Sequence, residues 1–440
     1  MSASETHQRI DAVWRHESAR VIAGLARMLR GDVGLAEELA QDALVTALEQ
    51  WPRGGVPDNP GAWLMTTAKH RAIDRLRRHQ LIERKHVELV HELERQQEQQ
   101  VSASEASLDD PFGDDVLRLM FIACHPVLAM EARVALTLRL LGGLTTAEIA
   151  RAFLQSESTV AQRIVRAKRS LAKAEVPFEV PRGEQLAERL SSVLGVISLV
   201  FNEGYSATAG DDWMRPALCD EAIRLGRVLA GLMPREPEVL GLLALMELQA
   251  SRTAARADVD GRPVLLAGQD RALWDHALIE HGLAMLDRVE KLGGARGPWA
   301  LQAAIAACHA RAGRAEDTDW ARIAALYGQL VQVAPSPVIE LNRAVAVSMA
   351  DGPAAGLALV DPLRGEAGLA GYHLLPAVRG DLLARLGRRA EARVEFERAA
   401  ALTANRRERE LLLARADGIP LPTGEGEAKA PGQGSGGAGS

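Results

Sequence analysis

The clearest candidate for binding chemistry is a basic, amphipathic segment at residues 144–173, LTTAEIARAFLQSESTVAQRIVRAKRSLAK. At the helical period, Arg166, Arg169 and Lys173 fall on one side of its second half, opposite Val160 and Ile164. A helix that reads the major groove of DNA needs an apolar face for its own core and a cationic face for phosphates and base edges. The segment therefore predicts DNA binding; an ordinary helix with a solvated basic face is the alternative.

The residues before this helix predict the turn that such a helix needs. Thr145 and Glu148 have the spacing of a capping box, which begins a short first helix. A break at Gln155 and Ser156 separates it from the longer basic helix. Together these features predict a helix-turn-helix, which favours the DNA-binding interpretation.

A second basic stripe lies at residues 62–78, AWLMTTAKHRAIDRLRR. Arg71, Arg75 and Arg78 share one side of the predicted helix, and a Pro/Gly-rich loop, WPRGGVPDNP, precedes it. An aromatic ring beside cations can hold an unstacked base and its phosphate backbone. The segment therefore predicts contact with single-stranded nucleic acid, with a core position for Trp63 as the alternative.

An acidic segment at residues 36–42 precedes both basic stripes. Glu38 and Asp42 stand four residues apart on one predicted helix face, where like charges repel each other slightly. This face would be stabilised by a basic partner; a solvated acidic surface is the alternative.

The composition of the 440-residue chain favours an all-α fold. Ala, Leu, Arg and Glu dominate, and aromatic residues make up only 4%. The net charge of −6 gives no sign of nucleic acid, but the charge is uneven. Residues 91–115 hold one arginine against eight acidic residues, whereas residues 116–175 hold nine basic residues against four acidic ones.

Cysteine usage and hydropathy predict where the protein works. The three cysteines stand far apart, which argues against a disulfide framework or a cysteine-rich zinc site and fits a reducing compartment. The first residues lack a signal-peptide pattern, and every apolar run is shorter than the roughly 20 residues that span a bilayer. We therefore expect a cytoplasmic protein with no membrane contact, no metal and no cofactor.

Four segments, taken in order, resemble bacterial RNA polymerase sigma factors of the extracytoplasmic-function (ECF) type. GDVGLAEELAQDALVTALEQW and WLMTTAKHRAIDRLRR are similar to sigma domain 2, and GGLTTAEIARAF and STVAQRIVRAKRSL to sigma domain 4. DDVLRLMFIACHPVLAMEARVALTLRLLGGLT and LVFNEGYSAT resemble the ECF group with a long extension like tetratricopeptide repeats (TPR). The resemblance implies an alternative sigma factor that directs promoter-specific initiation by RNA polymerase core, with the extension regulating its activity.

The resemblance and the breaks in the pattern divide an all-α chain into five parts. Near the end, Gly380, Leu383, Ala392, Phe396 and Ala399 match the offsets of a TPR. The expected parts are a sigma domain 2 helical bundle at 10–85, an acidic flexible linker at 86–115, a sigma domain 4 helix-turn-helix at 116–175, a TPR-like helical array at 186–416 and a disordered tail at 418–440.

The resemblance also implies which residues meet which partner. The clamp helices of the largest polymerase subunit would be bound by Glu37, Glu38, Gln41 and Asp42. The −10 element would be held as single-stranded DNA by Asn59, Trp63, Lys69, His70, Arg71, Arg75, Arg77 and Arg78. The −35 duplex would be read by Glu157, Ser158, Thr159, Gln162, Arg163, Arg166, Lys168 and Arg169.

A stand-alone DNA-binding regulator is the nearest alternative to a sigma factor. A stand-alone helix-turn-helix regulator with a TPR-type sensor would explain residues 144–173, but not the acidic and basic helices of the first 80 residues. In either case an unidentified protein or ligand could bind the C-terminal array.

An enzyme is the more distant alternative. Residues 109–115, DDPFGDD, invite comparison with the Mg²⁺-binding motifs of helical prenyl-chain enzymes, but the proline and glycine between the acidic pairs prevent a shared helix face. His125 beside Cys124 in an apolar stretch indicates a packed core histidine rather than a metal ligand. We therefore expect no catalytic activity.

Overall fold

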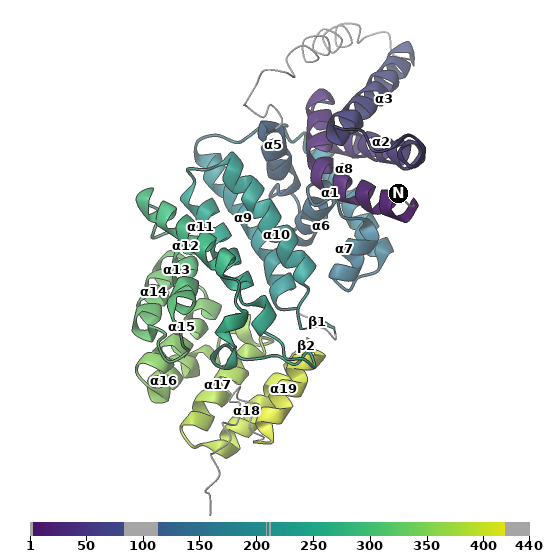
Figure 1. Cartoon of the computed structure of the whole chain (residues 1–440). Helices are drawn as coiled ribbons and strands as arrows, with labels where there is room; N and C mark the ends of the chain where they lie inside the picture. Colours follow the sequence, from purple (N-terminus) through teal and green to yellow (C-terminus); the bar gives the residue numbers. More distant parts are fainter. Residues whose placement is uncertain (1–2, 83–112, 208, 211–212, 419–440) are drawn as a thin grey trace, which may run out of the picture. The chain divides into compact units, whose positions relative to one another are not determined.

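The structure is a computed structural model that describes residues 3–82, 113–207, 209–210 and 213–418, and α-helices dominate these residues (Figure 1). Within this part of the chain, the strands β1 (Ala209–Gly210) and β2 (Ala404–Asn405) form one short parallel pair. The all-α prediction is confirmed. No helix among the described residues is long and apolar enough to cross a membrane.

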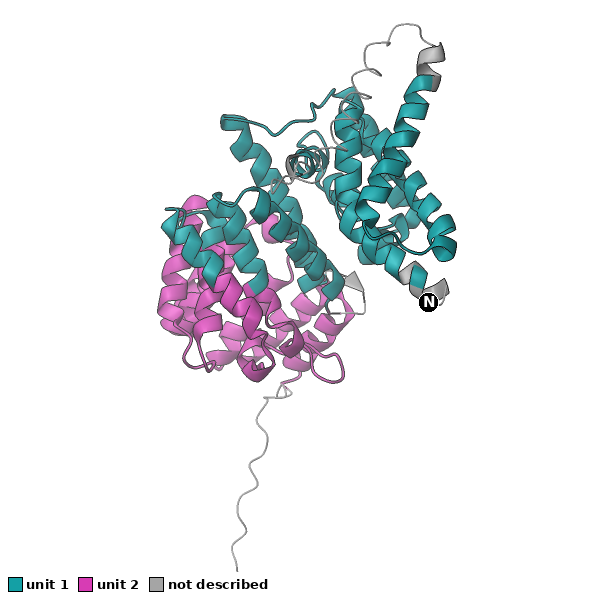
Figure 2. Cartoon of the chain, turned by 45° about the horizontal axis from the view of Figure 1, so that its top comes forward, with its two compact units in different colours: residues 1–207, 214–247, 284–300 teal, residues 208–213, 248–283, 301–440 magenta. Residues whose placement is uncertain are grey.

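The chain divides into two compact units (Figure 2). Unit 1 comprises residues 1–207, 214–247 and 284–300, and unit 2 comprises residues 208–213, 248–283 and 301–440, each as far as it is described.

Unit 1 begins with three helices that pack on one another, namely α1 (Ala3–Met28), α2 (Val33–Gly54) and α3 (Pro60–Ile82). The side chain of Asp32 caps α2 by accepting a hydrogen bond from the Leu35 amide, with 2.9 Å between the heavy atoms. Asn59 caps α3 in the same way, 3.0 Å from the Ala62 amide, and Pro60 takes the first helical position.

The loop expected from Trp51 onwards begins later in the structure. Helix α2 continues through Pro52 and ends before Gly55, whose φ of 84° suits glycine. The reason is the burial of Trp51, which is 3% exposed and packs edge-to-face on Trp63 with 5.3 Å between ring centroids. Trp51 is therefore a core residue of the first three helices.

Four further helices of unit 1 follow, α5 (Gly113–Ala123), α6 (Met130–Leu140), α7 (Thr146–Ala152) and α8 (Glu157–Lys173). Asp115, expected as the last residue of a solvated linker, lies in α5 and is fully buried. It is held there by ion pairs with Arg118 at 2.6 Å and with Arg27 of α1 at 3.3 Å. The rest of the predicted linker, residues 86–112, lies outside the described residues.

Helices α9 (Glu184–Tyr205) and α10 (Pro216–Leu232) pack on α5 and α6 and complete their core. Arg189 of α9 donates a hydrogen bond to the Phe121 carbonyl at 2.8 Å, and Arg224 of α10 to the Leu141 carbonyl at 2.6 Å. The helices α11 (Pro237–Ala250), α12 (His276–Lys291) and α13 (Pro298–Arg311) lie partly in unit 1 and partly in unit 2.

Unit 2 is a succession of helices, each packed on the next from α14 onwards. They are α14 (Trp320–Val333), α15 (Pro337–Ala350), α16 (Pro353–Leu363), α17 (Leu374–Arg385), α18 (Arg389–Leu402) and α19 (Arg406–Ala416). Gly380 lets α17 approach α18 closely, because a Cβ atom there would lie 3.0 Å from the Phe396 ring. The TPR-like character of the array stays a prediction, and the tail from residue 419 lies outside the described residues.

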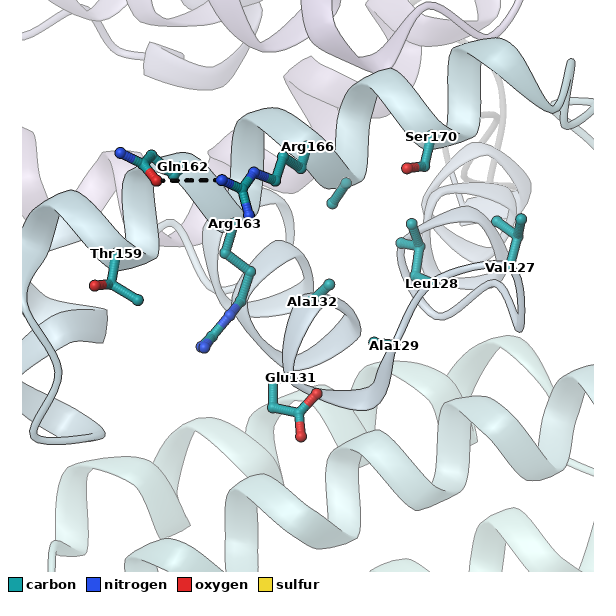
Figure 3. Close-up of a pocket in the computed structure, with 11 residues that line it drawn as sticks. Val127, Leu128, Ala129, Glu131, Ala132, Thr159, Gln162, Arg163, Arg166 and Ser170 are labelled. Atoms are coloured by element: carbon teal, nitrogen blue, oxygen red, sulfur yellow. Dashed lines mark hydrogen bonds between the residues drawn. The ribbon is translucent and has the colours of Figure 1, made fainter.

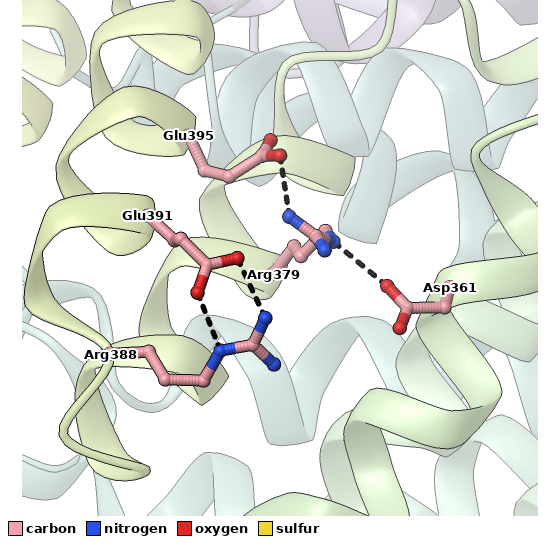
Figure 4. A network of polar contacts seen from close by, with 5 residues as sticks. All are labelled: Asp361, Arg379, Arg388, Glu391 and Glu395. Carbon is pink, nitrogen blue, oxygen red and sulfur yellow. Dashed lines mark hydrogen bonds and ion pairs between the residues drawn. The ribbon is translucent and has the colours of Figure 1, made fainter.

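A polar network joins three of these helices (Figure 4). The buried Arg379 of α17 pairs with Asp361 of α16 at 2.9 Å and with Glu395 of α18 at 2.7 Å. Arg388 and Glu391 form a second, exposed pair nearby. A buried guanidinium with carboxylates on both sides fixes which helices are neighbours.

Candidate nucleic-acid interface

The helix-turn-helix is formed by α7 and α8 as the sequence predicts. Thr145 and Glu148 make both hydrogen bonds of the capping box at the start of α7. Burial raises the pKa of Glu148, but its hydrogen bonds with the Thr145 amide and hydroxyl, together with the charges of Arg15 and Arg151, lower the pKa overall. Ser156 caps α8 by accepting a hydrogen bond from the Thr159 amide at 3.1 Å.

One face of α8 is core and the other is polar. The buried residues are Val160, Ile164, Ala167 and Leu171. Arg163 is half-buried and donates to Gln155 in the turn at 2.7 Å, whereas Arg166 and Arg169 are exposed. The remaining predicted −35 residues on this helix, except Lys168, are also exposed, namely Glu157, Ser158, Thr159 and Gln162.

A hollow of about 340 Å³ lies beside this polar face (Figure 3). Its walls come from the turn before α6 (Val127, Leu128 and Ala129), from Glu131 and Ala132 at the start of α6, and from α8. Arg163 and Arg166 line it together with Gln162, which accepts a hydrogen bond from Arg166 at 3.5 Å. The hollow thus adjoins the polar face of α8.

Lys168 points elsewhere. Its ammonium group forms an ion pair with Glu37 of α2, and its side chain is 22% exposed. Lys168, predicted to contact the −35 element, and Glu37, predicted to contact polymerase, therefore bind each other in this structure.

The cations of α3 are paired as well. Arg71 lies 3.4 Å from Asp42 and donates to the Thr46 hydroxyl at 2.6 Å, and Arg75 lies 2.8 Å from Glu38. Arg71 and Arg75 are exposed, as their periodicity predicts. Their partners are acidic residues for which the resemblance to sigma factors implies polymerase binding.

The other predicted −10 residues also lie at or near α3. Trp63 is half-buried against Trp51, and Asn59 caps the helix. Burial and the nearby charge of Arg27 lower the pKa of Lys69. His70 and Arg77 are exposed, and Arg78 lies on α3 with its side chain outside the described residues.

The predicted polymerase-binding residues of α2 differ in how deeply they are buried. Glu37 is 3% exposed, and its carboxylate accepts from Arg139 of α6 at 2.6 Å and from Gln41. Glu38 is exposed, and Asp42 and Gln41 are half-buried. Sequence reasoning missed Arg139, which stands 102 residues from Glu37, and no local pattern joins the two.

Cys124 and His125 both make hydrogen bonds within the fold. Cys124 is buried, which raises the pKa of its thiol to about 11. His125 is half-buried rather than fully packed, and its Nδ1 lies 3.1 Å from the Val127 amide. Among the described residues, no three histidine, cysteine or acidic side chains gather as a metal site would require.

Comparison with known families assigns a class to this arrangement. The family "Sigma-70 region 2" matches residues 15–82, over α1–α3, and "Sigma-70, region 4" matches residues 118–171, over α5–α8. A family of unknown function, DUF6596, matches residues 189–290. The fold and the matched regions together define a DNA-binding transcription initiation factor of the sigma-70 class.

Two relatives narrow the class. The ECF RNA polymerase sigma factor SigK of Mycobacterium ulcerans (strain Agy99) is 31% identical over 165 residues, which cover 36% of this chain and 80% of that protein. The chain belongs to the ECF RNA polymerase sigma factors. An uncharacterized protein of Rhizobium meliloti (strain 1021) is 47% identical over 390 residues, 88% of this chain and 90% of that protein, so this similarity extends into the C-terminal helices.

Membership of this family defines the general function of the chain in transcription initiation. Sigma factors bind RNA polymerase core and promoter DNA and direct promoter-specific transcription. They act by binding and are not enzymes.

Proposed function

We propose that the protein is an alternative sigma factor in which α8 reads the −35 duplex, α3 and the loop before it hold single-stranded −10 DNA, and α2 binds the clamp helices of the polymerase. The observation that carries the proposal is the division of α8, with Val160 and Ile164 buried and Arg166 and Arg169 exposed. This division leaves cations available for the major groove while the helix stays anchored.

The proposed contacts of α2 with polymerase and of α3 with DNA are supported by the charges of their side chains. Glu38 and Asp42 would meet basic polymerase side chains, and Arg71 and Arg75 would then be released to bind the phosphates of the −10 strand. Contacts to an unpaired base and its backbone would offset the few kcal/mol that unstacking costs. Because the partner is RNA polymerase, we expect the protein to act in the cytoplasm.

Run-off transcription tests the proposal. Full-length protein and purified core polymerase are combined on promoter fragments from the host genome, and co-elution with core is measured in parallel. Specific transcripts are expected. Duplex binding without co-elution and without transcripts would instead indicate an independent helix-turn-helix regulator.

We also propose that the C-terminal helices regulate this activity through α10. Arg215 donates to the carbonyl of Ala152, the last residue of α7, at 2.6 Å, next to the turn that leads into α8. A shift of α10 would therefore move the helix-turn-helix. Removing everything after residue 175 would not test this, because Arg189 and Arg224 hold α5 and the end of α6.

Single substitutions test the regulatory proposal instead. Arg215→Ala should change the amount of specific transcript while leaving core binding intact, and exposed Arg235→Ala on the loop after α10 is the matched control. Equal transcription by both variants and the unchanged protein would contradict regulation through α10.

A further inference from the structure

Three buried polar atoms that lack a hydrogen-bond partner gather in one short segment of unit 2 (Figure 2). In the part of the chain that the structure describes, they are Oε1 of Gln269, Nη1 of Arg271 and Nε1 of Trp274. The Gln269 residue is 9% exposed and Trp274 is 4% exposed. Buried polar groups are nearly always paired, because an unpaired one costs stability. Three unpaired atoms within residues 269–274 therefore need a common explanation.

The segment that carries these atoms is firmly held. Arg271 begins the short 3-10 helix Arg271–Leu273, which Asp270 caps with its side chain. This helix packs on a second 3-10 helix, Thr253–Ala255. The Nε atom of Arg271 donates to the carbonyl of Ala312, just after α13, at 3.0 Å. The backbone contacts thus fix the Arg271 guanidinium through Nε and leave Nη1 for another acceptor.

Two arginines lie near the ring of Trp274. The guanidinium carbon of Arg271 is 4.5 Å from the ring centroid, and that of Arg252 is 5.9 Å from it. Each cation is attracted to the indole ring, but two cations around one ring repel each other. Burial, and then the charge of Arg252, lower the pKa of Arg271. A negative charge beside the ring would relieve this repulsion.

The acidic side chains nearby offset the positive charge only in part. Glu316 and Asp317, both exposed on the loop after α13, raise the pKa of Arg271, but burial and Arg252 lower it by more. The field of the arginines also reaches His309 of α13. Burial, followed by the charges of Arg252 and Arg271, lowers the pKa of His309 to about 4, so the imidazole is neutral at neutral pH. The surroundings of Trp274 therefore favour an anion.

We propose that Gln269, Arg271 and Trp274, with the charge of Arg252, form a binding site for a small oxyanion, the phosphate or carboxylate group of a small molecule. Nη1 of Arg271 and Nε1 of Trp274 would donate to its oxygens, because guanidinium and indole N–H groups are donors only. Oε1 of Gln269 would accept from a hydroxyl on or beside the anionic group. The site gives the C-terminal helices a ligand, and it does not depend on the proposed contacts with polymerase or promoter.

Calorimetric titration of the full-length protein tests the site. Inorganic phosphate and acetate are the two probes, and sodium chloride at equal ionic strength is the control. We expect saturable binding of at least one oxyanion with a dissociation constant of roughly 1 mM or below. Binding of phosphate alone or of acetate alone would identify the anionic group of the ligand. Saturable binding of neither probe, or an equal response to chloride, overturns the inference.

Trp274→Phe tests the indole nitrogen by itself. It keeps an aromatic ring beside the arginines but removes the Nε1–H donor, and it should weaken oxyanion binding roughly three- to tenfold. Trp51→Phe is the matched control, since Nε1 of Trp51 is also buried without a partner in the described structure but lies in unit 1. This control should bind like the unchanged protein. Equal affinities of the two variants would overturn the assignment of Trp274.

Arg271→Gln tests the charge and the donor together. It should weaken oxyanion binding by about tenfold or more, because hydrogen bonds to charged groups are the stronger ones. Arg364→Gln removes the same charge from an exposed arginine after α16 and should leave the affinity unchanged. Arg271→Lys keeps the charge but not the planar fork, so its affinity should lie between those of Arg271→Gln and the unchanged protein. An unchanged affinity of folded Arg271→Gln overturns the inference, and Trp274→Phe keeps it testable if Arg271→Gln fails to fold.

The acidic neighbour offers a test in the opposite direction. Asp317→Asn removes negative charge near Arg271 and should tighten oxyanion binding about twofold. Asp351→Asn makes the same change at an exposed position after α15 and is the control. A purely structural role of Arg271 would not make the anion affinity depend on Asp317. Unchanged or weaker binding by folded Asp317→Asn therefore counts against an anion beside Arg271.

Discussion

The two candidate DNA-binding helices, α3 and α8, are both basic and amphipathic but have different surroundings. On α8, Arg166 and Arg169 are exposed beside a hollow, whereas on α3, Arg71 and Arg75 pair with acidic side chains of α2. Arg166 and Arg169 of α8 are therefore accessible as they stand, whereas Lys168 of the same helix is held by Glu37. For α3 to bind −10 DNA as proposed, Arg71 and Arg75 must exchange the carboxylates of Asp42 and Glu38 for DNA phosphates. Binding of the −10 strand is then coupled to any partner that engages these carboxylates of α2.

Substitutions on α8 should have the largest effect. The double variant Arg163→Ala with Arg166→Ala should lower promoter-specific run-off transcription by far more than tenfold, because each base contact by an arginine fork contributes about 1–3 kcal/mol. Co-elution with core polymerase should be unchanged. Exposed Arg311→Ala is the control. Loss of core binding in the double variant would contradict the separate roles of the two helices.

Glu37 and Glu38 are neighbours on α2, but the ion pairs of Glu37 are buried and that of Glu38 is exposed. Glu37→Gln leaves Arg139 and Lys168 without their carboxylate and should destabilise unit 1 by about 2 kcal/mol, a fall in Tm of roughly 4–8 °C. Glu38→Gln should cost less than about 1 kcal/mol, because its pair with Arg75 is exposed. Calorimetry measures both, and equal shifts would show that Glu37 is not a structural ion pair.

Removing a cation from α3 should affect DNA binding more than stability. Arg75→Ala should change the free energy of unfolding by less than about 0.5 kcal/mol, since its ion pair is half-exposed on both sides. Transcription should fall a few-fold, and the salt dependence of promoter binding should lose about 0.9 in log–log slope for one phosphate contact. An unchanged slope would mean that Arg75 only pairs with Glu38.

The sequence could predict what lies on each helix face, but not what that face meets. Periodicity identified the buried Val160 and Ile164 and the exposed Arg166, and local spacing identified the capping box at Thr145, because these features depend on neighbours within one or two turns. The contact of Glu37 with Lys168 depends on packing between distant segments, which no periodicity encodes.

Tertiary packing also explains the two local errors. The Pro/Gly-rich residues after Trp51 predict a loop that begins there, yet Trp51 is buried against Trp63 and α2 extends through Pro52. The acidic neighbours of Asp115 predict a solvated linker, yet Asp115 is buried and pairs with Arg27 of α1, which is distant in the sequence. In both cases one buried contact outweighs the local composition.

The smallest expected effect concerns the turn that supports α8. His125 accepts a hydrogen bond from the Val127 amide at 3.1 Å, and Val127 lines the hollow beside α8. Burial, assisted by the charges of Arg189 and Arg133, lowers the pKa of His125 to about 4. The histidine is thus neutral in the folded protein at neutral pH and can accept this bond.

The sign of the pH dependence follows from that pKa. The unfolded chain binds a proton at His125 near pH 6.5, whereas the folded protein resists it until about pH 4, so stability falls as the pH drops through this window. His125→Asn keeps an acceptor for the Val127 amide but cannot titrate. Between pH 7 and 4.5 its free energy of unfolding should therefore fall less than that of the unchanged protein, by under about 1 kcal/mol after allowance for solvent screening, and its Tm should fall less in the same way. Parallel Tm curves would show that protonation of His125 leaves the support of α8 intact, and the contrast between α8 and α3 would then rest on their ion pairs alone.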